Sequence, residues 1–214
     1  LEWVKPKTLR AICQQKVGHL SKKTTIYVGK QEPKTMRIIK EILKKNTSKK
    51  IFYGKAWTLK RIGNKRVYKD NKGKIILKSK KILSEGLWHN VGLACRVARD
   101  LKIPKKSILR AVSKLQFEGR LQYIKGKLTK LLNKKEKLLI DGCHSEASAK
   151  NLASYLKGID QDIYGIWGMQ QNKNPELFIK QFKGIFKKII TVKIPDEPNS
   201  CKPHELKKIA NRAG

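Results

Sequence analysis

The chain has 214 residues, 39% of them hydrophobic, which is enough for one large domain or two modest domains with packed cores. This content excludes a disordered tail. No stretch of 18 uncharged apolar residues occurs, and the opening LEWVKPKTLRAIC lacks a signal-peptide pattern, so we expect a cytoplasmic protein with no membrane partner.

The charge is strongly positive, with 51 Lys and Arg against 16 Asp and Glu, a net charge of +35. Such an excess favours polyanionic partners, either nucleic acid or multiply charged small molecules. Lys and Arg are spread over nearly every segment, however, and no zinc-finger, RRM or helix-turn-helix spacing occurs. We therefore favour general surface basicity over a dedicated nucleic-acid face.

The predicted elements up to residue 83 alternate between helix and strand. They are a helix in PKTLRAICQQKVG, a strand in TTIYVG, a helix in PKTMRIIKEILKKN, a strand in KIFYG and a basic hairpin over residues 55–81. The hairpin tract carries eleven basic residues and only one acid, Asp70, with a turn at Asn71 to Gly73.

After residue 83 the pattern changes to two successive helices and then returns to alternation. The helices are HNVGLACRVARDL and PKKSILRAVSKL; then follow strand-like GRLQYI and KLLID, a helix after Ser145, strand DIYGIWGM, helix PELFIKQFKGIF, strand KKIITVKI and a last helix from Lys202. Strands that alternate with helices predict an α/β fold with a mainly parallel sheet and right-handed crossovers.

The stretch LLIDGCHSEASAKNL, residues 138–152, is an apolar run that ends abruptly in polar residues. A strand that feeds a helix places this turn at the carboxyl edge of the sheet, where open α/β sheets bind ligands, so Asp141 and His144 would face a crevice. The alternative is an ordinary Asp-Gly turn with Ser145 as a helix N-cap.

The four cysteines have no CxxC spacing, and none lies beside His at metal-ligand spacing. We expect them to be reduced thiols.

Five separated stretches resemble, in order, the signatures of the folylpolyglutamate synthase and dihydrofolate synthase family of the Mur ligase superfamily. They are LRAICQQKVGHL, IYVGKQ, HNVGLACRVA, FEGRLQYI and LLIDGCHSEASAKNLASYL. The resemblance runs from about Leu9 to Leu156 and continues more weakly through IYGIWGMQQNKNPELF. It implies that residues 1–83 are the C-terminal part of an ATP-binding ligase domain, of the Mur central type. Residues 84–214 would form a Rossmann-like Mur ligase C-terminal domain, truncated at its end.

The resemblance also implies an ATP-dependent amide (C–N) ligase with ATP and Mg²⁺ as cofactors. A folate or dihydropteroate carboxylate would become an acyl phosphate, which the amine of L-glutamate attacks. The enzyme must clamp phosphates and hold two anionic substrates together, and a basic site suits them. The alternative function is a basic, non-enzymatic module that binds nucleic acid or another polyanion.

Four residues match the family's ATP contacts. Asn90 matches an ATP-contacting Asn, although it could also be a helix N-cap. Arg120 matches an Arg whose guanidinium binds phosphate oxygens, where an ordinary surface Arg is the alternative. Asp141 would accept hydrogen bonds from ribose hydroxyls, and His144 would stack on or hydrogen-bond the nucleotide.

Lys16 matches a family lysine that reacts with carbon dioxide to give a carbamate, which ligates magnesium. It falls on an apolar helix stripe with Leu9, Ile12 and Cys13. Burial there would lower the lysine pKa and supply the neutral amine that carbamylation needs. The alternative is that the side chain snorkels to solvent.

The sequence also departs from the family pattern. Gln15 replaces a common Glu, Ser145 replaces an Asn, and LWH replaces a His-Gln pair before Asn90. No GxxxxGK[ST] phosphate loop is present. We therefore expect a fragment that carries half of an active site and is inactive alone, with a separate P-loop-bearing chain as a candidate partner.

Overall fold

The computed structural model describes Pro6 and residues 8–213, so Lys7 and the first five residues of the first predicted domain lie outside the described residues. The chain divides into two compact units. The first contains residues up to Lys80 together with Gly86–Leu115, and the second contains Lys81–Glu85 together with Gln116–Gly214.

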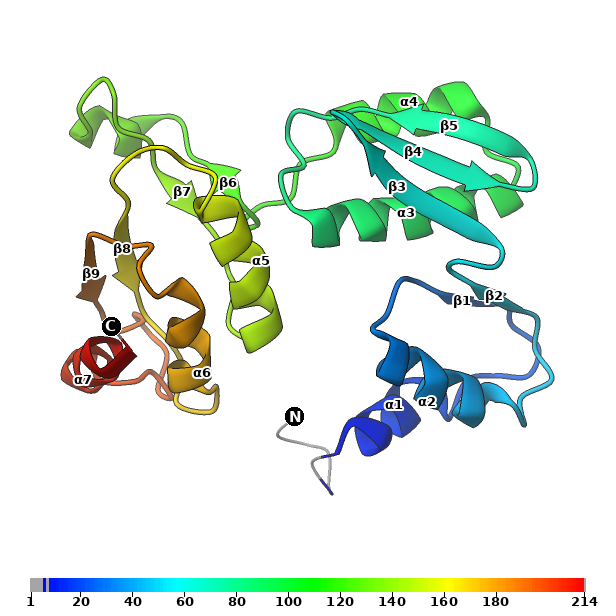
Figure 1. Cartoon of the computed structure of the whole chain (residues 1–214), viewed down its shortest axis with the longest axis horizontal. Helices are drawn as coiled ribbons and strands as arrows, with labels where there is room; N and C mark the ends of the chain where they lie inside the picture. Colours follow the sequence, from blue (N-terminus) through cyan, green and yellow to red (C-terminus); the bar gives the residue numbers. More distant parts are fainter. Residues whose placement is uncertain (1–5, 7, 214) are drawn as a thin grey trace. The chain divides into compact units, whose positions relative to one another are not determined.

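The elements of the first unit are coloured blue to green in Figure 1. In chain order they are α1 (Leu9–Val17), β1 (Ile26–Val28), α2 (Pro33–Leu43), β2 (Lys50–Phe52), β3 (Trp57–Ile62), β4 (Lys65–Asp70), β5 (Gly73–Leu77), α3 (Glu85–Asp100) and α4 (Lys105–Lys114).

This division differs from the boundary expected at residue 83, because α3 and α4 belong to the first unit. The reason is packing: α3 lies so close to β3 that a Cβ at Gly92 would come within 2.9 Å of Trp57 and 3.2 Å of Leu59. The change from strands to helices after β5 therefore does not separate two domains, because β3 to β5, α3 and α4 belong to the same unit. The assignment of the two parts to ligase domain types stays a prediction.

Strands β1 and β2 pair in parallel, with α2 as the crossover between them. Helices α1 and α2 cover one face of this pair, where a core forms from Cys13, Ile26, Val28, Ile38, Ile39 and Leu43. Thr8 begins α1 as its N-cap, accepting a hydrogen bond from the Ala11 N–H, and Pro33 opens α2 at a position that needs no backbone donor.

The basic tract forms a three-stranded antiparallel meander, β3-β4-β5, where a single hairpin was expected. Gly63 and Gly73, both with positive φ, take the tight positions of its two turns. The inner face is fully apolar at its centre, since Trp57, Tyr68 and Ile75 are at most 2% exposed. The outer face carries the lysines.

Asp70, the one acid of the basic tract, is buried at the end of β4. Its carboxylate accepts hydrogen bonds from Arg99 Nε at 2.7 Å, Arg99 Nη2 at 2.9 Å and the Tyr68 hydroxyl at 3.0 Å. Burial alone would raise the pKa of Asp70, but these bonds and the Lys72 N–H hold that pKa below its ordinary value. The pair joins the meander to α3.

A second ion pair continues this network along α3. Arg96 donates to both carboxylate oxygens of Asp100, from Nε at 3.1 Å and Nη2 at 2.9 Å, and also donates to the Ala56 carbonyl. The Tyr27 hydroxyl donates to Asp100 as well, which joins β1 to the same helix. Paired, bidentate arginines are the form in which proteins tolerate buried charge.

The second unit contains the remaining elements. They are β6 (Gln122–Tyr123), the 3₁₀ helix η1 (Lys127–Leu131), β7 (Leu139–Ile140), α5 (Glu146–Leu156), β8 (Tyr164–Trp167), α6 (Pro175–Ile179), the 3₁₀ helix η2 (Lys180–Phe182), β9 (Lys188–Thr191) and α7 (Pro203–Ala213). Strands β8 and β9 pair in parallel, as the α/β alternation predicted, whereas β6 and β7 pair antiparallel.

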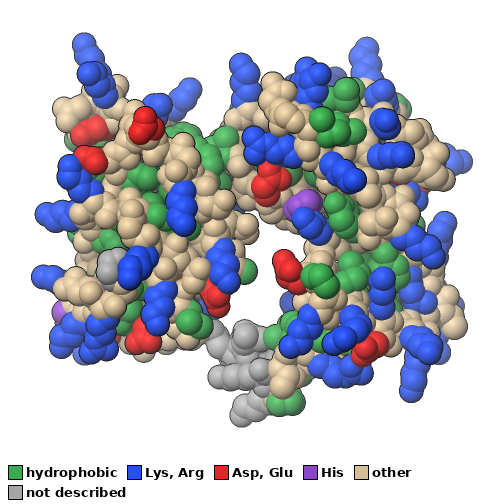
Figure 2. All heavy atoms as spheres, in the orientation of Figure 1, with side chains coloured by type: hydrophobic (Ala, Val, Ile, Leu, Met, Phe, Trp, Pro, Cys, Tyr) green, Lys and Arg blue, Asp and Glu red, His purple; other side chains and the backbone are tan. Residues whose placement is uncertain are grey.

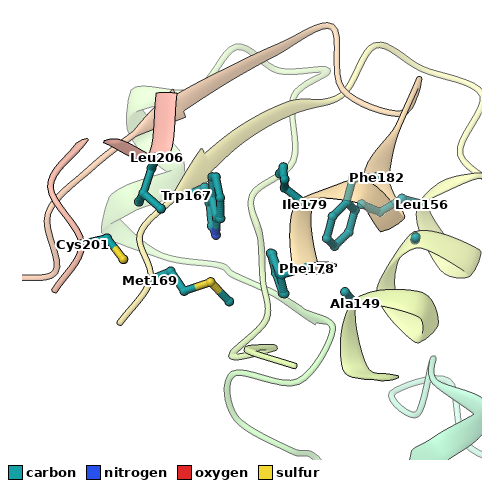
Figure 3. Packing of buried hydrophobic residues seen from close by; sticks show 10 residues of the cluster. Ala149, Leu156, Trp167, Met169, Phe178, Ile179, Phe182, Cys201 and Leu206 are labelled. Carbon is teal, nitrogen blue, oxygen red and sulfur yellow. The ribbon is translucent and has the colours of Figure 1, made fainter. Parts of the chain in front are cut away.

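The core of the second unit is built from aromatic rings (Figure 3). Trp167 stacks on Phe178 with ring centroids 5.9 Å apart, and Phe178 contacts Phe182 at 5.2 Å. Small residues of α5, Ala149 and Ala153, let that helix approach the rings closely. Apolar burial therefore holds this unit together.

The four cysteines are free thiols, and Cys13, Cys95 and Cys201 are buried. Among the helices described, none is both long and apolar enough to cross a membrane.

Candidate functional site

The predicted ligand edge is a turn that runs from the end of β7 at Ile140 to the start of α5 at Glu146. The sequence forms it because Asp141 and Gly142 break the strand and Ser145 caps the helix. The Ser145 side chain accepts from the Ser148 N–H, and the Ser148 hydroxyl accepts from the Ser145 N–H at 3.0 Å. This capping box fixes where α5 begins.

Asp141 holds the turn against the neighbouring loop. Its Oδ2 accepts a hydrogen bond from the Leu121 N–H at 2.7 Å, and its Oδ1 accepts one from the Cys143 N–H at 2.8 Å. Leu121 has φ +44°, a left-handed conformation that costs energy for a residue with a side chain. Asp141 therefore has a structural role that the sequence did not reveal: it stabilises the backbone beside Arg120.

Arg120 lies over Gly142. A Cβ at Gly142 would come within 3.1 Å of Arg120 Nη1, so the glycine leaves room for the guanidinium. The backbones are joined as well, because the Gly142 N–H donates to the Gly119 carbonyl at 2.7 Å. Arg120 is exposed, and within the described residues no carboxylate pairs with it. It is a positioned cation with its donors available.

His144 is exposed in the same turn, with Nδ1 3.0 Å from the Gly142 carbonyl. A carbonyl oxygen only accepts, so Nδ1 carries the proton and Nε2 of the neutral ring is left as an acceptor towards solvent. The structure thus brings Arg120, Asp141 and His144 together around Gly142. The signal that sequence reasoning passed over is Gly142 itself, where any side chain would crowd the guanidinium.

Burial raises the pKa of the neighbouring Cys143 thiol to about 12, and the Asp141 carboxylate adds to this rise. A thiol whose pKa is raised in this way carries little thiolate at neutral pH.

Asn90 belongs to the first unit, so its convergence with the other three residues stays a prediction. The expected N-cap role is wrong, because α3 begins five residues earlier, at Glu85. Asn90 is exposed at one end of a shallow groove of about 500 Å³, which we call the α3 groove. Its other lining residues are all apolar: Leu93, Ala94, Val97, Ala98, Leu101 and Ile103.

Lys16 is exposed on α1, so the burial expected for it is not found. The inward stripe of this helix runs through Leu9, Cys13 and Val17 instead. Nor do the described residues contain a group of three or more His, Cys, Asp or Glu side chains that could hold a metal ion. The described residues do not by themselves fit a magnesium site, and carbamylation of Lys16 stays a prediction.

Basic side chains are spread over the visible face of both units, as Figure 2 shows, and do not gather over one element. The surface charge therefore supplies a generally positive field around the turn that carries Arg120.

Comparison with known proteins gave a result for the fold only. No model of a protein family matches the sequence, and no curated protein matches it. Solved structures do match over nearly the whole chain. Escherichia coli FolC in complex with ADP matches with a TM-score of 0.80 and 16% identity over 98% of this chain and 48% of its own. Folylpolyglutamate synthase from Thermotoga maritima matches with a TM-score of 0.74 and 17% identity over 99% and 50%.

A bifunctional folylpolyglutamate synthase/dihydrofolate synthase with Mn, AMPPNP and L-glutamate bound matches with a TM-score of 0.78 and 15% identity, over 96% of this chain and 47% of its own. The chain thus spans about half the length of the enzymes it resembles. Its mixed α/β architecture is the fold of the C-terminal portion of the folylpolyglutamate synthases, the family that the sequence motifs predicted.

Proposed function

We propose that this chain is the part of a folylpolyglutamate synthase-like, ATP-dependent amide ligase that binds the nucleotide from one side. The observation that carries the proposal is the arrangement around Gly142, in which an exposed guanidinium without a carboxylate partner among the described residues lies beside a helix N-terminus. The fold supports it, since structural relatives are described in complex with ADP, and E. coli FolC also with DHPP and ADP.

Arg120 is the residue we assign to the phosphates. A guanidinium offers two parallel N–H donors to phosphate oxygens, and backbone N–H groups at the start of α5 favour negative charge nearby. Asp141 acts as a positioning residue, because its hydrogen bond to the Leu121 N–H fixes the backbone that carries Arg120. His144 Nε2 is left to accept a hydrogen bond from the nucleotide.

The reaction we assign is transfer of the terminal phosphoryl group of ATP to a folate or dihydropteroate carboxylate with release of ADP, followed by attack of the glutamate amine on the acyl carbon, which forms the amide and releases phosphate. Phosphoryl transfer depends on positioning and on charge stabilisation by a phosphate loop and its metal ion. The sequence has no GxxxxGK[ST] motif, so that loop must come from elsewhere, and the chain alone should turn over neither ATP nor folate. Asn90 would contact the same nucleotide, and Lys16 would require a magnesium ion held by the other half.

The test is nucleotide binding by the chain, and turnover with and without a P-loop-bearing ligase half added as a separate polypeptide. Arg120→Ala should weaken ATP binding by about 10- to 100-fold, the worth of a hydrogen bond to a charged group, and Arg120→Lys should recover part of the loss. Arg212→Ala, which removes an exposed arginine of α7, is the matched control.

Equal affinities of the Arg120→Ala and Arg212→Ala variants would refute the phosphate role of Arg120. A weak nucleotide affinity together with RNA binding that falls steeply with salt would favour the polyanion-binding module instead.

A further inference from the structure

The outer face of the meander β3-β4-β5 is a surface on which folding collects lysines. Alternate residues of a strand point to opposite faces, and the inner face, which includes Trp57 and Tyr68, is buried. The outer face carries exposed lysines from all three strands and from the residue after β5, namely Lys60, Lys65, Lys69, Lys74 and Lys78. These lysines are interspersed with apolar residues in the sequence, and the strand register brings them onto one face.

No carboxylate balances these charges. Asp70 is the one acid between Glu41 and Glu85, and its carboxylate is turned inward to Arg99. Within the part of the chain that the structure describes, none of the five outer-face lysines forms an ion pair. A basic patch without acids creates a local positive potential, so this face suits an anionic partner.

The arrangement of the lysines opposes the stability of the sheet. Lys69 and Lys74 lie directly opposite each other in the register of β4 and β5, and like charges placed in this way repel. Lysines on edge strands can prevent aggregation, but Lys69 belongs to β4, the central strand of the three. Edge protection therefore does not explain Lys69. Negative charge outside the chain would relieve the repulsion.

Aliphatic side chains occupy the same outer face. Ile62 and Ile76 are 60% and 49% exposed, and Val67 is half-buried between Lys60 and Ile76 in the register. The strand residues of this face include no aromatic residue, arginine, asparagine or glutamine, the side chains that stack on bases or bind base edges. Lysines combined with exposed aliphatic residues are instead suited to a lipid surface, where charge attraction and apolar burial act together.

We propose that the outer face of the meander binds the surface of a bilayer that contains anionic phospholipids. This inference goes beyond the proposed ligase function and does not rest on it. The lysines contact lipid phosphates, while their aliphatic stems and the neighbouring isoleucines lie against the boundary between headgroups and acyl chains. Binding of this kind needs no spanning helix, so our expectation of no membrane partner, which rested on the lack of one, does not bear on it.

The test is sedimentation of the intact chain with phosphatidylcholine vesicles, with and without phosphatidylserine. We expect binding only to the vesicles that contain phosphatidylserine, and weaker binding at high salt. The double substitution Lys69→Gln and Lys74→Gln should weaken binding about 25-fold, because each lysine near an anionic leaflet contributes about fivefold. The matched control is Lys207→Gln with Lys208→Gln on α7, which removes the same charge from two other exposed positions.

A second variant, Ile76→Ser, distinguishes a lipid surface from a nucleic acid because it leaves the charge unchanged. We expect this variant to bind the vesicles severalfold more weakly, since less apolar surface is removed from water. Its binding to RNA should equal that of the unsubstituted chain. Ile76 is half exposed, so the variant should fold, and Ile62→Ser repeats the test at an independent position.

Equal losses of vesicle binding in the two double variants would overturn the proposal, because binding would then follow the total charge of the chain. Vesicle binding that neither Ile76→Ser nor Ile62→Ser weakens would also overturn it, since no aliphatic side chain would then enter the membrane surface. So would a larger loss of RNA affinity than of vesicle affinity in the Lys69→Gln and Lys74→Gln variant, which would assign the face to nucleic acid.

Discussion

The two units of this chain are held together by different physics. In the first, buried ion pairs join the meander to α3, with the Asp70 side chain fully excluded from solvent. In the second, aromatic rings fill the core, and the ion pairs found there, such as Lys187–Asp162, are exposed. In the first unit, removal of one partner would therefore leave a buried charge unpaired, whereas the core of the second unit is sensitive mainly to the volume and shape of its rings.

The largest expected effect comes from Asp70→Ala, which leaves Arg99 buried without its carboxylate. We expect the first unit to lose about 3–5 kcal/mol of unfolding free energy. Peptide-resolved hydrogen exchange should show the loss in β3 to β5 and α3. The control is Asp162→Ala in the second unit, where the pair is exposed and no measurable change is expected. Similar effects of the two variants would remove the contrast between the units.

A core substitution tests whether the second unit depends on the packing of its aromatic rings. Phe178→Leu keeps the second unit apolar but removes ring contacts with Trp167 and Phe182, so we expect a loss of about 2 kcal/mol. Trp167 is the only tryptophan of the second unit, and its fluorescence should report the lower urea midpoint. A shift confined to the first unit would contradict this account.

A smaller effect is expected from Ser145→Ala, which removes the N-cap of α5 beside the candidate site. The expected loss is about 1 kcal/mol. The matched variant in the first unit is Thr8→Ala at the N-cap of α1, which should lose a similar amount. Because capping is local, amide exchange should rise in the first turn of the affected helix only. Spread of the change across either unit would show that more than a cap had been lost.

The smallest expected difference between the two units is in how their free energies of unfolding respond to acid. The Asp70 pKa is lower in the folded chain than its ordinary value of 3.8, so its stabilisation is complete above about pH 4 and is lost as the pH falls through the folded pKa. In a Trp167→Phe background, urea titrations between pH 5 and pH 2 should show this weakening. The added substitution Asp70→Asn should remove that dependence. If the free energy of unfolding depends on pH just as strongly in the Asp70→Asn variant, that dependence arises from other carboxyl groups.

The sequence predicted the α/β class, most of the helices and strands and the turn after β7, because periodicity and turn residues are local signals; it predicted one hairpin where the structure has the three strands β3-β4-β5. It could not predict the role of Asp141, since the Leu121 N–H that it binds is twenty residues away in the chain. The Asp70–Arg99 pair was missed for the same reason. The available hint was that Asp70 is the single acid among eleven basic residues of this tract.

Lys16 shows a different limit of sequence reasoning. Leu9, Ile12, Cys13 and Lys16 fit an apolar stripe by spacing, but α1 is rotated so that Val17 packs inward and Lys16 does not. One residue of rotation is about 100°, which spacing alone cannot resolve in a helix of nine residues. The alternative N-cap role of Asn90 was wrong for another reason, because α3 begins five residues earlier, at Glu85.

Three of the four thiols, those of Cys13, Cys95 and Cys201, are buried, and Cys143 is half-buried, so we expect slow reaction with alkylating and oxidising reagents. Burial raises the pKa of Cys95 to about 11 and that of Cys143 to about 12, so neither supplies much thiolate at neutral pH. A cysteine introduced at Ala94 would face solvent and react far faster with a maleimide dye. Its labelling rate would then report directly, in a crude mixture and without purification, whether the α3 groove is covered.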